Sequence, residues 1–313
     1  MAKICFGIDV GGTTVKCGMF TTDGTLLDKW EITTRTENGG ENVLPDIAAT
    51  VISKLRLKGY KDEDCAGIGV GIPGPVMRGV VPVAVNLHWG EKNVEYELSQ
   101  LTGMKVRAAN DANVAALGEA WKGGGEGKKE IIVVTLGTGV GGGIIIDGAI
   151  VEGLHGAGGE IGHMHVDDNI TALCNCGHSG CLEQVASATG IARLAREELA
   201  LHPEYTGDLR TGEVTAKAVF DAYKEDDPLA TRVVNRFAKY LGTALANIAV
   251  VIDPEVIVIG GGVSRAGECL TDIVGNYYRS IAFSACANTP IVLARLGNDA
   301  GIYGAAKLVL GKL

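Results

Sequence analysis

The chain has no run of five or more basic residues, and its 28 Lys and Arg residues are outnumbered by 37 Asp and Glu residues. The formal net charge is −9 and the isoelectric point is about 5.2. Such a sequence offers no electrostatic footprint for nucleic acid or for an anionic membrane surface. We therefore expect neither as a partner, and any phosphate site must be local.

Segments that would direct export or membrane insertion are also missing. Residues 1–10 lack the layout of a signal peptide because Asp9 and nearby glycines interrupt the apolar run. The longest apolar stretch, Ile131 to Ile146, contains five glycines and is shorter than the ~18 residues that a spanning helix needs. The sequence therefore predicts a cytoplasmic protein.

The sequence contains neither a complete Walker A loop nor a dinucleotide-binding G-x-G-x-x-G loop that opens a helix. The Walker A pattern G-x-x-x-x-G-K could include Gly127 and Lys128 only if residue 122 were a glycine. That residue is Lys122, so the pattern is not met. The pattern G-x-G-x-x-G occurs at 69–74 and 137–142, and in a dinucleotide-binding protein it must open a helix. The first match runs into Pro73 and Pro75, and the second runs into a predicted strand, so neither opens a helix. A nucleotide would have to be bound by another scheme.

Glycine is abundant, and it marks a repeated pattern. The 313 residues, 46% of them hydrophobic, suffice for about two domains, and the 46 glycines cluster beside β-rich runs. Apolar periodicity predicts strands at 4–10, 15–20 and 25–33, a helix at 41–57 and a strand at 66–72. A weaker second copy starts near residue 130, with strands at 131–136, 140–146 and 149–151. This repeat indicates two similar α/β halves.

Further predicted elements are a strand at 104–109, helices at 111–121, 183–200, 215–223 and 228–251, a strand at 255–259, and a last helix from about residue 299.

The turn after the first strand combines glycines with polar groups that suit a phosphate. Backbone N–H groups in a glycine turn can approach phosphate oxygens closely because no side chain blocks the approach. Asp9 could hold magnesium, directly or through water. The phosphate-binding candidates here are Asp9, Gly11, Gly12, Thr13 and Lys16. A plain hairpin turn with a capping aspartate is the alternative.

A second cluster has the composition of a zinc site. His163, Cys174, Cys176 and Cys181 supply one imidazole and three thiolates within 19 residues. Because four protein ligands leave no open position, the ion would be structural and would fix a loop. Three reduced cysteines near a surface histidine remain an alternative, with His165 and His178 as substitute ligands. Eight cysteines without a secretory signal favour free thiols over a disulfide framework.

Several motifs in order along the chain resemble the ROK family of repressors and sugar kinases. They are Asp9-Val-Gly-Gly-Thr, Asn110-Asp111, Leu136-Gly-Thr-Gly-Val-Gly-Gly-Gly, Glu160-Ile-Gly-His163, Cys174-x-Cys176-Gly-x-x-Gly-Cys181-Leu-Glu183, Gly260-Gly-Gly and Leu296-Gly-Asn-Asp-Ala-Gly. The resemblance spans nearly the whole chain. It implies an α/β protein with the actin-like ATPase (ribonuclease H-like) fold, in which two similar α/β domains flank a catalytic cleft. The domains would be 1–115 plus 298–313, and 116–297 carrying the zinc loop.

The resemblance also implies an activity, the ATP-dependent phosphorylation of a hexose at its 6-hydroxyl. Asp111 would be the catalytic base, because a sugar hydroxyl needs a carboxylate to accept its proton. The cofactors implied are ATP, Mg²⁺ at Asp9 and structural Zn²⁺. The sugar-binding residues implied are Asn86, Asn110, Asp111, Glu160, His163 and Glu183. The nucleotide loops implied are Gly137, Thr138 and Gly139 together with Gly260, Gly261 and Gly262.

Alternatives remain for single residues and for the activity. Asp111 could cap a helix while also acting in catalysis, and the three glycines at 260–262 could serve simple strand-to-helix packing. Asn86-Leu-His-Trp89 resembles the glucokinase pattern and favours glucose, against N-acetylmannosamine, N-acetylglucosamine, allose or fructose. Polyphosphate could serve as a donor in addition to ATP.

The rival from another class is a sugar-responsive repressor of the same family. Those regulators carry an N-terminal winged-helix domain, whereas the first predicted strand here starts at about Ile4. The sequence therefore favours an enzyme whose partners are a sugar and a nucleotide. A homodimer or homotetramer is the oligomeric state expected from the family.

Overall fold

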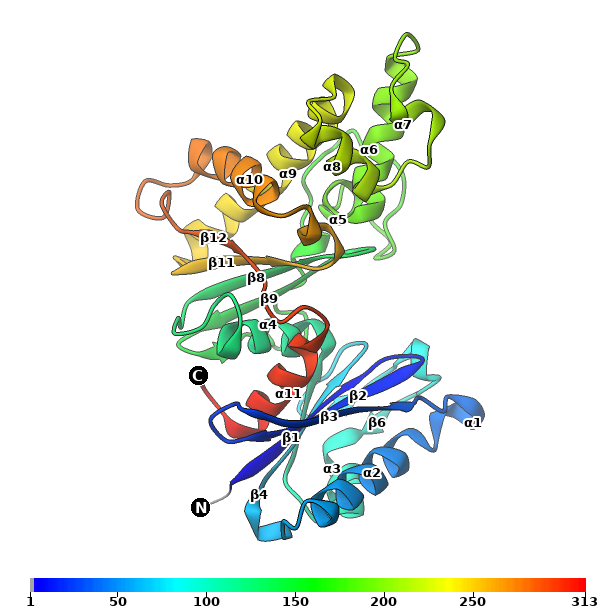
Figure 1. The fold of residues 1–313 in the computed structure, drawn as a ribbon, viewed down its shortest axis with the longest axis vertical. Coiled ribbons are helices and arrows are strands. Elements are labelled where there is room, and N and C mark those ends of the chain that lie inside the picture. The colour runs from blue at the N-terminus through cyan, green and yellow to red at the C-terminus, as the bar shows by residue number, and fades with distance from the viewer. Residues whose placement is uncertain (1–2) are drawn as a thin grey trace. The chain divides into compact units, whose positions relative to one another are not determined.

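The computed structural model describes residues 3–313, which divide into two compact units (Figure 1). Unit 1 comprises residues up to 129 together with 143–159 and 296–313, and unit 2 comprises 130–142 and 160–295. The domain boundaries at 115/116 and 297/298 stay a prediction.

The sheet of unit 1 combines a meander with a parallel extension. Its strand order is β3-β2-β1-β4-β7, with the first three strands antiparallel and β1, β4 and β7 parallel. The bounds are β1 Ile4–Val10, β2 Thr14–Thr21, β3 Leu26–Thr33, β4 Cys65–Ile72 and β7 Val106–Asn110. The predicted order of three strands, a helix and a strand is confirmed.

Helices cover both faces of this sheet (Figure 1). Helix α2 (Val43–Leu57) buries the apolar stripe Val43, Leu44, Ile47, Val51 and Leu55, which repeats at helical spacing. It packs with α3 (Val94–Thr102), while α11 (Ala300–Leu310) packs against β1 and β4 and against α4 (Asp111–Lys122). Shorter elements of unit 1 are α1 Glu37–Gly40, β5 Val80–Val81, β6 Lys92–Asn93, η1 Asp62–Asp64, η2 Val85–Leu87 and η5 Gly297–Asp299.

The contact between α4 and α11 depends on a glycine. A Cβ at Gly304 would lie 1.5 Å from the carbonyl oxygen of Val114, so the two helix backbones touch with no room for a side chain. We expect Gly304→Ala to lower the free energy of unfolding by about 1–3 kcal/mol or more, because the backbones must separate. Denaturant titration measures this effect, and Gly90→Ala is the control because a Cβ there meets nothing within 4 Å. Equal stability of both variants would contradict the close packing.

The second sheet repeats the topology of the first. Its order is β10-β9-β8-β11-β12, and β8, β11 and β12 are parallel, like β1, β4 and β7. The repeat predicted from sequence is therefore confirmed, with β8 and β9 in the places of β1 and β2. The bounds are β8 Ile131–Leu136, β9 Val140–Ile146, β10 Ala149–Ile150, β11 Val256–Gly260 and β12 Ile291–Leu293.

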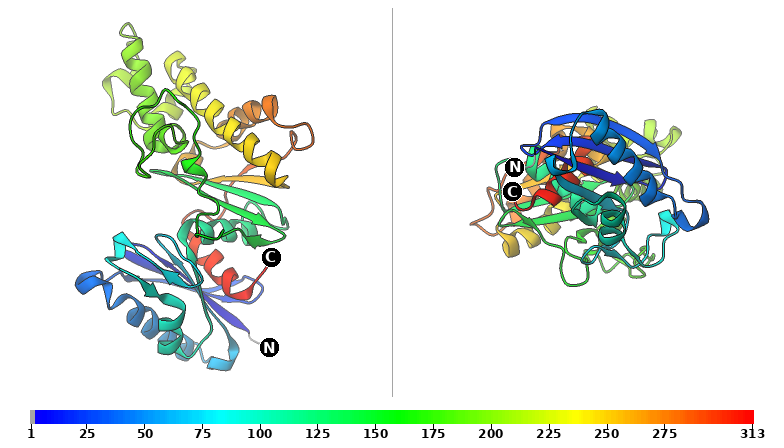
Figure 2. Two further views of the ribbon diagram at one scale, coloured as in Figure 1. Left: turned by 180° about the vertical axis from the view of Figure 1, so that it is seen from behind. Right: turned by 90° about the horizontal axis from the view of Figure 1, so that it is seen from below.

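Helix α9 (Pro228–Ile252) is the centre of the helical layer of unit 2, and α6, α8 and α10 pack against it (Figure 2). One predicted helix, 183–200, is wrong as a single element. Ser187 is extended, with φ −78° and ψ 170°, and its side chain accepts a hydrogen bond from the Gly190 N–H, so it ends α5 and caps α6. The bounds are α5 Glu183–Ala186, α6 Ala188–Leu201, α7 Asp208–Thr211, α8 Ala216–Lys224, α10 Glu268–Ile281, η3 Ile161–His163 and η4 Gly262–Ala266.

Within residues 3–313, no helix is both long enough and apolar enough to cross a membrane.

Candidate active site and metal centre

In unit 1, a row of three strands carries the first set of candidate residues. Asp9, at the end of β1, pairs in register with Gly71 on β4, and Gly71 pairs with Ala109 on β7. Asn110 and Asp111 follow directly, at the carboxyl ends of these parallel strands. Ligands of open α/β sheets bind at such an edge. The sheet thus places Asp9 and Asp111 at the same edge, with β4 between their two strands.

The carboxyl group of Asp9 lies in a confined setting. Burial raises its pKa, the ammonium group of Lys16 on the neighbouring strand lowers it, and the nearby charge of Asp111 raises it. A Cβ at Gly301, in the first turn of α11, would lie 2.5 Å from Asp9 Cγ, so the helix backbone presses against the carboxylate. Two carboxylates at one edge of a sheet, one of them partly buried, have the donor chemistry that Mg²⁺ prefers.

At the junction between β7 and α4, one residue caps the helix and the next is the candidate catalytic base. The helix cap is Asn110, whose side-chain oxygen accepts hydrogen bonds from the N–H groups of Ala112 and Asn113 at 2.9 and 3.3 Å. Its amide nitrogen donates to the Gly74 carbonyl at 3.0 Å. Asp111 is the first residue of α4 and is exposed, and its Oδ1 accepts from the Ala112 N–H at 2.8 Å. The alternative in which Asp111 caps the helix is therefore wrong, because Asn110 does so.

The turn between β1 and β2 is closed by a hydrogen bond from Gly11 N–H to the Thr14 carbonyl at 3.0 Å. Gly12 and Thr13 are exposed at its tip. A Cβ at Gly12 would lie 3.5 Å from both Cβ and O of Asn86, so a predicted sugar-side residue meets a predicted phosphate turn. The ammonium of Lys16 donates to the Asn298 carbonyl at 3.3 Å. Unit 1 thus brings together Asp9, Gly11, Gly12, Thr13, Lys16, Asn86, Asn110 and Asp111.

In unit 2, the equivalent turn between β8 and β9 is tighter and holds Gly137, Thr138 and Gly139. It is closed by Gly137 N–H donating to the Gly139 carbonyl at 3.0 Å. Gly260 pairs with Thr135 in the parallel register of β11 and β8. A Cβ at Gly261 would lie 2.5 Å from the carbonyl oxygen of Leu136. The loop Gly260, Gly261 and Gly262 therefore lies against Leu136, the residue directly before the turn Gly137, Thr138 and Gly139.

A cavity of about 330 Å³ opens beside this pair of loops. Its walls come from α8, η4 and the start of α6, and they combine apolar side chains with a few polar ones. The lining residues are Ala188, Thr215, Ala216, Lys217, Phe220, Asp221, Gly262, Val263, Arg265 and Ala266. Pockets for small ligands have this mixed but largely apolar character.

Three further candidates of unit 2 surround the first residue of β9, Val140. Glu160 precedes η3 and His163 ends it, and a Cβ at Gly162 between them would lie 2.1 Å from the Val140 carbonyl oxygen. Glu183 Oε2 accepts from the Val140 N–H at 3.0 Å. Glu183 Oε1 lies 3.6 Å from Cys174 Sγ. The predicted sugar residues Glu160, His163 and Glu183 thus lie beside a predicted phosphate turn.

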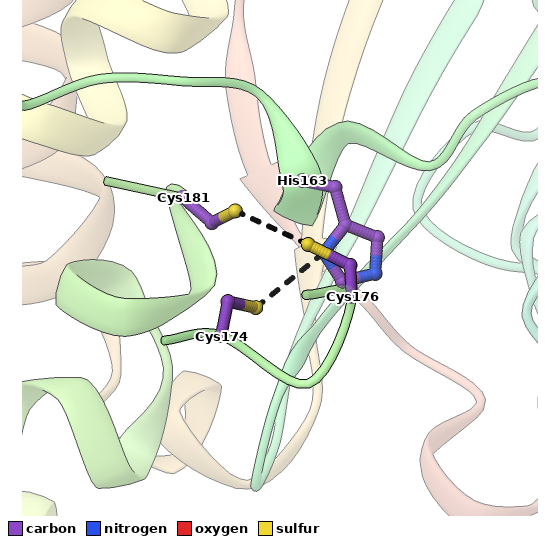
Figure 3. A group of neighbouring side chains, drawn as sticks. All are labelled: His163, Cys174, Cys176 and Cys181. Carbon is purple, nitrogen blue, oxygen red and sulfur yellow. Dashed lines mark hydrogen bonds between the residues drawn. The ribbon is translucent and has the colours of Figure 1, made fainter. Parts of the chain in front are cut away.

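The four predicted zinc ligands form one cluster (Figure 3). Cys174 Sγ lies 3.7 Å from His163 Nδ1, Cys176 Sγ lies 3.6 Å from Cys181 Sγ, and all four ligand atoms lie within 4.8 Å of one another. The structure also contains no disulfide in the described residues, where all eight cysteines are free. His165 is not part of the cluster, because its ring is hydrogen-bonded to the Ser179 carbonyl and to Asp168.

The spacing of this cluster fits a tetrahedral zinc ion. With Zn–S bonds of about 2.3 Å, two sulfurs at the corners of a tetrahedron lie about 3.8 Å apart. The distance of 3.6 Å between the sulfurs of Cys176 and Cys181 comes near this length, and the distance of 3.7 Å between Cys174 Sγ and His163 Nδ1 comes near the ~3.6 Å that one Zn–S bond and one Zn–N bond of ~2.1 Å give. One imidazole and three thiolates are also the donor set that zinc selects. His163, Cys174, Cys176 and Cys181 would therefore hold the ion.

The pattern of the family described as "ROK family" matches residues 5–312 of this sequence. The chain belongs to the ROK family. A glucokinase of Halalkalibacterium halodurans is 45% identical, over 97% of this chain and 94% of the relative.

Two solved ROK structures share the fold of this chain. One is a ROK family glucokinase from Streptomyces griseus in complex with glucose and AMPPNP, with a TM-score of 0.73, 32% identity, and coverage of 97% of this chain and 98% of that one. The other is a ROK hexokinase from Thermus thermophilus, with a TM-score of 0.80, 33% identity, and coverage of 98% and 97%. The actin-like ATPase fold predicted from sequence is therefore confirmed.

Sequence reasoning missed several residues that shape the ROK site. The motif at 296–301 was noted, but Gly301 was given no role, although it presses on Asp9. The walls contributed by Ala216, Phe220 and Val263 were not foreseen either, because nothing in α8 signals that its apolar face turns toward a glycine loop. Thr34 is only 7% exposed and its hydroxyl donates to the Gly11 carbonyl at 2.7 Å. A polar residue directly after a strand was its only signal.

Proposed function

We propose that this ROK protein is a glucokinase, which transfers the terminal phosphate of ATP to the 6-hydroxyl of glucose. The observation that carries the proposal is the pair Asp9 and Asp111 at the carboxyl edge of the sheet of unit 1, in a chain that is 45% identical to a glucokinase over nearly its whole length. The hexokinase-type phosphotransfer of this proposal is the activity that was predicted from the sequence.

Asp111 is the catalytic base in this proposal. A sugar hydroxyl becomes a good nucleophile when a carboxylate accepts its proton as the bond to phosphorus forms. Asp111 is exposed at the first position of α4, and because Asn110 already caps that helix, the carboxylate of Asp111 is not needed for capping. Its orientation is fixed through the Ala112 N–H.

Asp9 would hold Mg²⁺, which neutralises charge on the transferring phosphate when it is bound. The residue fits this role because burial raises its pKa and Asp111 adds a second nearby negative charge. A cation would relieve both effects. The turn Gly11, Gly12 and Thr13, with Lys16, would donate hydrogen bonds to phosphate oxygens.

The nucleotide would lie along the loops of unit 2. Gly137, Thr138 and Gly139 form a closed turn, and Gly261 of the loop 260–262 packs against Leu136 directly before it. The adjoining cavity of about 330 Å³ has apolar walls that suit a purine base, beside Gly262. ATP is therefore the donor proposed, and polyphosphate remains a second donor to test.

The sugar would be bound by Asn86, Glu160, His163 and Glu183 together with Asp111. Carboxylates and amides suit a ring of hydroxyls, and a hydroxyl left unpaired in such a site carries a large penalty. Asn110 is proposed to act indirectly, because both ends of its amide already bind the backbone. His163 faces the zinc cluster with Nδ1, so its Nε2 would serve the sugar.

Zinc would be structural here. Four protein ligands leave no position for a reacting group, so the ion fixes the segment between His163 and Glu183 and supplies no chemistry to the transfer. A homodimer or homotetramer and a cytoplasmic location stay predictions.

A substrate panel tests the proposed function. The purified protein is incubated with ATP, Mg²⁺ and either glucose, N-acetylmannosamine, N-acetylglucosamine, allose or fructose, and ADP release is followed. We expect kcat/KM for glucose to exceed that for the other sugars by at least about 10-fold, since one mismatched polar contact is worth about that much. ATP without sugar is the control. Preference for another hexose would move the specificity and keep the mechanism, whereas no ADP release from zinc-loaded, folded protein would favour a sugar-binding regulator.

A further inference from the structure

His88 has a backbone conformation that few residues with side chains adopt. Its φ is 56° and its ψ is 28°, in the left-handed region, and it directly follows η2, the short helix that carries Asn86. Residues other than glycine are uncommon in this region, and such residues concentrate at functional sites. A reason for this conformation is found in the contacts of the imidazole.

The imidazole is tied to a segment far away in sequence. His88 Nδ1 lies 3.1 Å from the Thr36 carbonyl oxygen, and since a carbonyl only accepts, Nδ1 carries the hydrogen and donates. The next residue repeats the connection, because the indole Nε1 of Trp89, 4% exposed, donates to the Gly40 carbonyl at 3.0 Å. The loop that presents Asn86 is thus fastened at two points.

The same segment is fastened at its other end to the phosphate turn. The Thr34 N–H donates to the Thr13 carbonyl at 2.9 Å, and the Thr34 hydroxyl donates to the Gly11 carbonyl at 2.7 Å. Residues 34–40, which we call the strap, therefore join the turn at 11–14 to the loop at 85–89. The position of a Gly12 Cβ, 3.5 Å from Asn86, shows that the two joined loops also touch.

We propose that His88 is a positioning residue, which holds Asn86 against the phosphate turn by donating from Nδ1 to the strap at Thr36. The left-handed backbone ends η2 and directs the imidazole at that carbonyl. This inference rests on the proposed function, in which Asn86 binds the sugar. Loss of the contact would weaken sugar binding while sparing the base and the nucleotide loops.

Three variants separate the side-chain contact from the backbone conformation. In His88→Asn the amide Nδ2 stands the same number of bonds from Cβ as Nδ1 of histidine, and asparagine adopts the left-handed region readily. His88→Gly keeps the conformation but lacks the donor. His88→Ala lacks the donor and is strained in that conformation.

The order of glucose KM values among these variants is the expected result. His88→Asn should stay within about 3-fold of the native protein, His88→Gly should rise about 3- to 10-fold, the worth of one hydrogen bond, and His88→Ala should rise further. The KM for ATP and kcat should change less than about 3-fold in the Asn and Gly variants. Equal KM for glucose in the native and Gly proteins, or an equal rise in the KM for ATP, would overturn the proposal.

Hydrogen exchange supplies a readout that does not depend on turnover. Amides of the strap and of residues 85–89 should exchange faster in His88→Gly than in His88→Asn, and unchanged exchange would overturn the positioning role. If the native protein phosphorylates no sugar, the proposed function fails, and glucose binding by calorimetry together with this exchange pattern still decides the role of His88.

Discussion

Asp111→Asn lowers kcat for glucose by at least about 10²–10⁴-fold, the usual contribution of a general base, and by more if the carboxylate also orients the hydroxyl. The substitution keeps the size of the side chain and an oxygen for the Ala112 N–H. The dissociation constant for glucose, measured by calorimetry, should change by less than about 10-fold. Steady-state ADP release gives kcat.

Asp147→Asn is the matched control for this substitution. It removes an exposed carboxylate elsewhere in unit 1, where Asp147 forms a surface ion pair with Lys312. Such pairs contribute little to stability, so activity should be retained. An Asp111→Asn enzyme with native kcat would eliminate Asp111 as the base, and a variant that only loses glucose affinity would make it a binding residue.

Removal of zinc should abolish glucose phosphorylation together with local order. We expect chelator-treated protein, or Cys176→Ser, to lose one zinc per chain and at least about 100-fold in kcat/KM for glucose, because His163 and Glu183 lose the framework that places them. Apparent zinc affinities of about 10–16 kcal/mol in small modules indicate how strongly such an ion stabilises its loop. Elemental analysis and hydrogen exchange over residues 160–183 measure metal and order separately.

Cys269→Ser is the matched control for the zinc prediction, since this thiol is half-buried and outside the cluster. It should retain zinc, activity and exchange protection. A zinc-free protein that keeps both native exchange at 160–183 and native turnover would show that the cluster neither binds the ion in a structural role nor supports the site.

The sequence predicted the architecture wherever a pattern repeats locally. Strand periodicity and paired glycine turns gave both sheets their first strands, and the spacing of His163, Cys174, Cys176 and Cys181 sufficed for the metal cluster because all four come from one short segment. Helix α3 and helix α10 were not predicted. The sequence carries signals for both ends of α3, since Asn93 caps its start and Gly103 its end, whereas the cap of α10 is Gly267, which has no side chain to offer.

Residues that act through distant contacts could not be read from the chain. Nothing near Asn110 in sequence indicates that its amide reaches the Gly74 carbonyl, and nothing near His88 indicates the Thr36 carbonyl, because partners 36 and 52 residues away are chosen by packing. Likewise Gly301 lies in a helix, where glycine is unfavourable, and the reason for it, the carboxylate of Asp9, is visible only in the structure. The sequence therefore indicates which side chains can perform the chemistry, whereas the contacts between loops follow only from the folded structure.

Glu183 touches both Cys174 and the Val140 N–H, on either side of one carboxyl group. A substitution of Glu183 that is meant to change sugar preference would also remove the hydrogen bond to the Val140 N–H, next to the nucleotide turn. It would alter the surroundings of the metal ligand Cys174 as well. Specificity changes in this protein are therefore better sought at Glu160, an exposed residue. The single carboxyl group of Glu183 thus restricts which positions a directed-evolution library can vary independently.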